Sequence, residues 1–269
     1  MRTFRLSAIA FTVSAAAALA VIAPALHAPS AQAQAPQEPA KPKPYTPVAV
    51  TPPAPASDPT FEAFRKQLAE VAQRKDRVGL GRLVVAQGFF WQREGGDGAD
   101  KKKSGIDNLA AAFGLDAKQG IGWDMLSDAA EDPTLEPSPE RSGVMCAPAE
   151  PKFDLAAFEQ LTKATGTDDS DWAFPVATGV EVRGGPQPHA AVIEKLGLHL
   201  VWVLPEEPPP ASARPNQPPT APPPVKIVTP TGKVGYVAID TIAPIGSEQL
   251  CYLKDASGWK IAGFIGGEQ

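Results

Sequence analysis

The chain has 269 residues, a formal net charge of −5 and two cysteines, and it uses proline 31 times. A mildly acidic balance argues against a nucleic-acid-binding protein. The length allows one or two ordinary domains, but most of the prolines fall in two runs that offer no apolar core, so the folded part is shorter than the chain.

The N-terminus has the organisation of a secretory signal peptide. Arg2 and Arg5 precede an apolar run at 6–26, and the small-residue pattern Ala31-Gln32-Ala33 follows it. We therefore predict cleavage after Ala33 and a periplasmic or secreted protein; a retained membrane anchor is the alternative. Removal of residues 1–33 leaves 23 basic and 30 acidic residues, a net charge of −7. No later segment is apolar enough to span a membrane.

The first proline run, residues 34–57, predicts a semi-rigid linker in the extended polyproline conformation. A helical domain is predicted to follow at 58–166. Asp58 and Pro59 are typical of a helix start, because the carboxylate caps free N–H groups and proline suits the first helical turn. A last helix is expected between a cap at Asp154 and a stop at Gly166.

The sequence changes character at Trp172. Short runs of Val, Ile and Leu, punctuated by Gly and Pro, predict short strands up to the second proline run at 205–224. Further strands are predicted after this run. A hairpin over 249–265, with its turn at "DASG", closes the chain.

Residues 174–244 resemble the bacterial SH3-like domain family. The stretch from Val180 to Pro186 is similar to the family's first-strand motif, with Glu181 where asparagine is usual, and "GKVGYV" at 232–237 matches its G-K-x-G-Y-V motif. The resemblance implies a small β-barrel, with the proline run 205–224 as a hairpin-tip insertion. The expected fold class is thus α+β: a small helical N-terminal domain, followed over 171–269 by an SH3-like β-barrel with a terminal β-hairpin.

The residues that could carry catalysis are few. The only cysteines are Cys146 and Cys251, and the mature chain has only His189 and His199; none stands in a pattern typical of a nucleophile and its base. In an exported protein the two cysteines suggest a disulfide, with two unpaired buried thiols as the alternative. The acidic stretch at 167–172 lacks the pattern of a calcium loop, so we expect no metal site and no cofactor.

Aromatic residues are the best candidates for ligand contact. Trp172, Trp202 and Tyr236 lie in or beside the expected barrel, and exposed aromatic rings can stack on sugars or hold a peptide. Arg183 can pair with a ligand carboxylate. The alternative is that the rings belong to the core or rim, because large aromatics usually supply core area in small barrels.

These features favour a non-catalytic periplasmic binding or scaffold protein. The resemblance implies that the SH3-like domain binds peptidoglycan or an envelope protein. One alternative is a cell-wall enzyme, or a subunit of one, in which this domain serves for targeting. In another, the domain recognises the chain's own proline-rich tracts.

Overall fold

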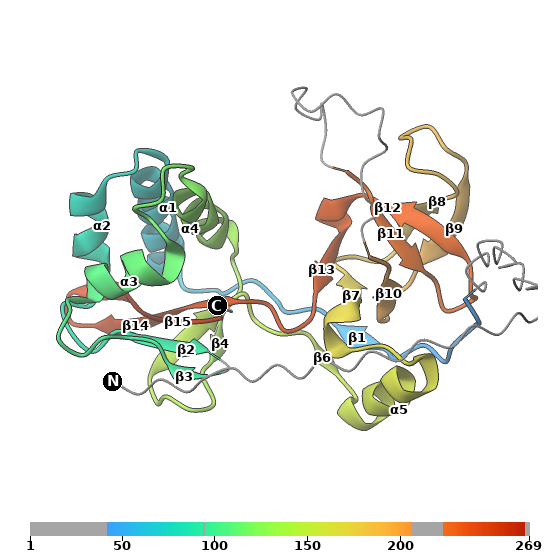
Figure 1. Ribbon diagram of the computed structural model, residues 1–269, viewed down its shortest axis with the longest axis horizontal. Helices are drawn as coiled ribbons and strands as arrows, with labels where there is room; N and C mark the ends of the chain where they lie inside the picture. The colour runs from blue at the N-terminus through green and yellow to red at the C-terminus, as the bar shows by residue number, and fades with distance from the viewer. Residues whose placement is uncertain (1–41, 94, 206–222, 267–269) are drawn as a thin grey trace, which may run out of the picture. The chain divides into compact units, whose positions relative to one another are not determined.

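The computed structural model describes residues 42–93, 95–205 and 223–266 (Figure 1). The expected signal peptide at 1–33, the first residues of the linker and most of the insertion at 205–224 lie outside these residues. Within the described ranges, no helix has both the length and the apolar character needed to cross a bilayer.

Four helices pack together in what we call the first module, residues 58–147 and 249–265. They are α1 (Pro59–Gln73), α2 (Arg77–Leu83), α3 (Gly105–Phe113) and α4 (Ile121–Glu131). The Asp58 side chain accepts a hydrogen bond from the Thr60 N–H, which confirms the predicted start of α1. The buried faces of these helices share one core with Leu250, Tyr252 and Ile261 of the terminal hairpin.

A six-stranded sheet forms the other layer of the first module (Figure 1). Its order is β3-β2-β15-β14-β5-β4, and only β15 and β2 run parallel. The strands are β2 (Phe90–Arg93), β3 (Gly96–Asp97), β4 (Glu136–Pro137), β5 (Val144–Ala147), β14 (Gln249–Asp255) and β15 (Gly258–Ile265). The terminal hairpin, expected beside the SH3-like strands, therefore supplies the two middle strands of this sheet.

The second module, residues 42–53 and 152–245, contains a seven-stranded sheet of order β13-β7-β10-β11-β12-β8-β9. Its strands are β7 (Trp172–Pro175), β8 (Val180–Arg183), β9 (Val192–Leu196), β10 (Val201–Val203), β11 (Val225–Val228), β12 (Val234–Val237) and β13 (Ile242–Pro244). The module also includes α5 (Leu155–Thr165) and the short helices η1 (Asp169–Asp171) and η2 (Ile239–Thr241). Each face of the sheet carries its own apolar cluster.

The predicted fold class is wrong. In the described part of the chain, β9 and β13 lie at opposite ends of the seven-stranded order and do not pair with each other, so the sheet is not a closed barrel. The region predicted as helical contains β2 and β5, and the whole is a mixed α+β fold with three sheets. β2 and β5 were missed because a run of four residues between helices shows too little alternation to be recognised as a strand.

Residues 42–57, predicted as linker, make specific contacts with the fold. β1 (Val50–Thr51) pairs with β6 (Lys152–Phe153), and Val48 and Val50 are buried in the second module. The Tyr45 N–H donates to the Pro230 carbonyl at 3.0 Å, and its hydroxyl donates to the Val228 carbonyl at 2.9 Å. We call residues 42–53 the N-terminal arm.

Candidate functional site

Tyr236 and Arg183 lie opposite each other on β12 and β8 of the second module. Directly paired residues leave a sheet on the same face, so the two side chains are neighbours. Gly235 allows the close approach of the strands, because a β-carbon there would lie 2.4 Å from Cγ1 of Val182. Gly232, with a φ of +79°, forms the turn before β12. Gly235 therefore acts at this site, whereas Gly232 shapes the turn that precedes β12.

Two adjoining cavities meet at Tyr236, with volumes of about 910 and 750 Å³. They share Pro186, Pro224 and Ile239, and the Ile239 side chain is half-exposed. We call the combined cavity the Tyr236 groove. Because proline rings and an aromatic ring change shape little, the groove is a preformed apolar surface of the kind that binds small molecules and peptides.

Fixed charges border this apolar surface. The guanidinium of Arg183 donates to the Glu181 carboxylate at 2.6 Å and to the Ala190 carbonyl at 2.9 Å, which holds it in place. Asp240 and Asp171 bring further carboxylates to the lining. The groove therefore offers both signs of charge beside apolar walls. Such a surface suits a ligand that carries carboxylate, amine and methyl groups.

The two tryptophans predicted to contact a ligand lie elsewhere in the second module. Trp172 is fully buried, donates its indole N–H to Thr167 at 2.9 Å and packs edge-on against Tyr45 at 5.3 Å, so it is a core residue. Trp202, paired with Trp172 across the strands, is partly exposed and lines a separate groove of about 760 Å³. Of the four candidates, only Tyr236 and Arg183 are therefore found lining the Tyr236 groove.

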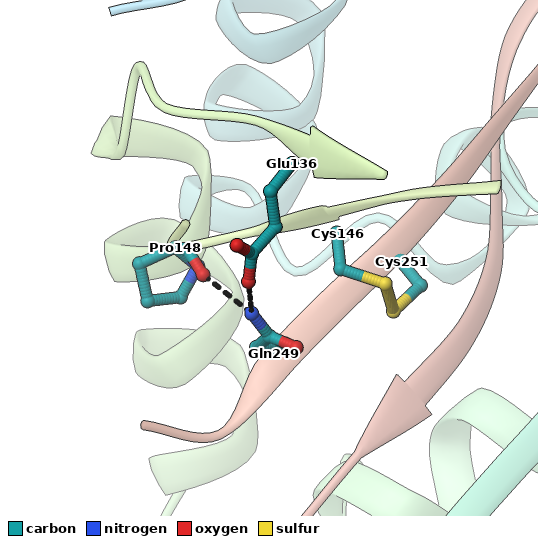
Figure 2. Close-up of a disulfide and its surroundings, with 5 residues drawn as sticks. All are labelled: Glu136, Cys146, Pro148, Gln249 and Cys251. Atoms are coloured by element: carbon teal, nitrogen blue, oxygen red, sulfur yellow. Dashed lines mark hydrogen bonds between the residues drawn. A yellow bond between two sulfur atoms is a disulfide. The ribbon is translucent and has the colours of Figure 1, made fainter. Parts of the chain in front are cut away.

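The cysteines form a disulfide between β5 and β14 of the first module (Figure 2). Cys146 and Cys251 are directly paired in the sheet and both are buried. Nearby, the Gln249 side-chain amide donates to Glu136 and to the Pro148 carbonyl, both at 2.7 Å. Because both sulfur atoms are joined in this bond, neither cysteine is available as a thiolate nucleophile.

No group of acidic, His or Cys side chains within the described residues has the geometry of a metal site. His199 forms an isolated bridge with Ala49 of the N-terminal arm, and its Nε2 is buried without a hydrogen-bond partner. Burial lowers the pKa of this imidazole. His199 is therefore better suited to a neutral structural role than to proton transfer with solvent.

The N-terminal arm is the element that sequence reasoning missed. Its Pro42, Pro44 and Pro47 line the groove beside Trp202, and Tyr45 is anchored in the core. The alternation of Val48 and Val50 within the proline run was an available signal, because alternate apolar residues are typical of a half-buried strand.

Comparison with known proteins does not assign the chain to a family: no family model matches it, and no curated protein or solved structure matches it significantly.

Proposed function

We propose that this protein is a non-catalytic binding protein of the cell envelope, and that its Tyr236 groove holds the stem peptide of peptidoglycan. The observation that carries the proposal is the pairing of Tyr236 with a fixed Arg183 inside a preformed apolar groove. Stem peptides combine carboxylates and amines with alanine methyl groups, and the groove offers a partner for each.

Two further observations support the cellular location. The N-terminal sequence has the order of a secretory signal, and the disulfide is typical of an oxidising compartment outside the cytoplasm. The resemblance of residues 174–244 to bacterial SH3-like domains supports the same ligand class, although the sheet is open. The proposed site therefore depends on the groove and its residues, and not on barrel closure.

The test is retention of the mature chain, residues 34–269, on insoluble peptidoglycan, together with titration of an isolated stem peptide that carries no sugar. We expect Tyr236→Ala to weaken binding of the stem peptide at least tenfold, about 1.4 kcal/mol or more, because an aromatic side chain at the centre of a site commonly dominates binding. Arg183→Gln should cause a larger loss of affinity for stem peptides with a free carboxylate than for amidated stem peptides.

Val176→Ala is the matched control, because Val176 is an exposed apolar residue of the same module that does not line the groove. Its binding should equal that of the unaltered chain. A folded protein that binds neither the insoluble wall nor the stem peptide would overturn the proposal. If Tyr236→Ala and Arg183→Gln left binding unchanged, the Tyr236 groove would not be the binding site.

A further inference from the structure

Trp202 differs from the other tryptophans in its hydrogen bonding. Four of the five indole N–H groups donate to protein acceptors: Trp91 to the Gly266 carbonyl, Trp123 to the Leu115 carbonyl, Trp172 to Thr167 and Trp259 to Thr60. Within the described ranges the Trp202 indole N–H has no acceptor, and the side chain is partly exposed. An indole N–H that takes no protein acceptor can donate to a ligand that reaches it.

The cavity beside Trp202, which we call the Trp202 groove, has walls held in place by the fold. One wall is the N-terminal arm, where Pro44 packs against Gly232 and Tyr45 is hydrogen-bonded to the backbone of the sheet. The other wall is α5, whose Phe158 and Leu161 are buried in the same core. Ligand binding therefore requires little ordering of the protein, which favours affinity.

The polar groups of this groove are mostly neutral. Among the described residues that line it, only Lys43 has a formal charge. Gln160 on α5 and Thr46 on the arm are exposed, and neither side chain makes a hydrogen bond within the described part of the chain. A cation would find no carboxylate among the described lining residues, and an anion would meet Lys43 alone. An uncharged ligand with several hydroxyl groups would find a free amide, a free hydroxyl and a free indole N–H beside an apolar ring.

We infer that the Trp202 groove is a second binding site, which takes a neutral sugar ring. The C–H bonds of a pyranose ring pack against the indole of Trp202, and its hydroxyl or acetamido groups bond to Gln160. This site goes beyond the proposed function, because none of the described residues that line it also lines the Tyr236 groove and it needs neither Tyr236 nor Arg183.

Titration of residues 34–269 with the tetrasaccharide of N-acetylglucosamine, followed by tryptophan fluorescence and calorimetry, tests this inference. We expect saturable binding, weakened at least threefold by Gln160→Ala and by Trp202→Phe, which keeps a ring but removes the N–H. Gln160 is exposed, so its substitution tests the site without risk to the fold. Gln73→Ala, an exposed glutamine on α1, is the matched control and should bind like the unaltered chain.

Tyr236→Ala should leave sugar binding unchanged, which separates this inference from the proposed function. A tetrasaccharide of glucose distinguishes the two kinds of neutral ring: binding of both sugars through Trp202 supports a site for pyranose rings in general, and binding of the first alone supports one that reads the acetamido group. Absence of saturable binding of either sugar to the folded chain would overturn the inference. Equal affinity of the unaltered, Gln160→Ala and Trp202→Phe chains would overturn it too.

Discussion

Each module includes one segment that is separated from the rest of it in the sequence by the other module. The two segments stabilise their modules through different contacts. The first module receives the C-terminal hairpin, whose β14 and β15 lie in the middle of its sheet. The second module receives the N-terminal arm, which contributes a two-residue strand and the anchored Tyr45. Neither module is therefore one continuous stretch of sequence.

The two completing segments also differ in what they add to their modules. The hairpin brings long backbone ladders and a disulfide, whereas the arm brings side-chain anchors and leaves exposed prolines along a groove. Both cavities that we assign to ligands lie in the second module. We therefore expect its completion to matter for binding as well as for folding.

Removal of the disulfide tests the completion of the first module and should have the largest effect. Cys146 and Cys251 are 105 residues apart. Linking ends so distant restricts the unfolded chain by about 4 to 5 kcal/mol in the loop-entropy treatment, so Cys146→Ala with Cys251→Ala should lower the free energy of unfolding by an amount of that order. Urea denaturation measures it.

The reductant provides the control for this experiment. A reducing agent should destabilise the unaltered chain to a similar degree and should leave the double alanine variant unchanged. If reduction had no effect on the urea midpoint of the unaltered chain, the disulfide would not contribute to stability and the contrast between the modules would lose its main support.

Substitution of Tyr45 tests the completion of the second module. Tyr45→Ala removes a ring that packs 5.3 Å from Trp172, centroid to centroid, together with the hydrogen bond to Val228. We expect a loss of about 2 to 4 kcal/mol in the free energy of unfolding, because the vacated space cannot be refilled completely. Tyr45→Phe keeps the ring and should cost about 1 kcal/mol.

The same pair of variants distinguishes an anchored arm from a passive linker. Weaker sugar binding in Tyr45→Ala than in Tyr45→Phe would show that the arm forms a wall of the Trp202 groove. Equal stability and equal binding of both variants to the unaltered chain would mean that the arm is dispensable for the second module.

Local features of this fold could be predicted from the sequence, and distant pairings could not. Asp58 and Gly166 were correctly assigned to the ends of helices, because a cap and a left-handed stop depend only on nearby backbone groups. Alternation along β10 places Trp202 and Val201 on opposite faces of the sheet. It does not say what covers each face, and the structure shows that the arm and α5 cover the face of Trp202. The hairpin at 249–265 was predicted and is present, but its place in the first module's sheet was not predicted, and neither were the contacts of the arm, because the partners of both lie far away in the sequence.

For the candidate site, too, the sequence indicated single residues and not their neighbours in space. Arg183 and Tyr236 lie in the two separate motifs that carry the resemblance, and each was named as a candidate by itself; their direct pairing is seen only in the structure. Trp172 was named as a candidate for ligand contact because it is aromatic and lies beside the expected barrel. Its burial follows from Tyr45 and Phe158, which lie outside the region of resemblance.

The smallest effect on the free energy of unfolding is expected from Glu150. This residue links two of the segments that run between the modules. Its carboxylate accepts hydrogen bonds from the N–H groups of Gly246 and Ser247, and burial raises its pKa. A carboxyl group with a raised pKa in the folded state stabilises the fold below its unfolded pKa, and this contribution is lost as the pH rises through the folded value. The contribution of Glu150 to the free energy of unfolding should therefore fall slightly between pH 4 and pH 7, and Glu150→Gln should remove this contribution from the pH profile. Urea denaturation across that range measures it; an identical slope in both proteins would show that the two backbone N–H groups compensate fully for burial of the charge.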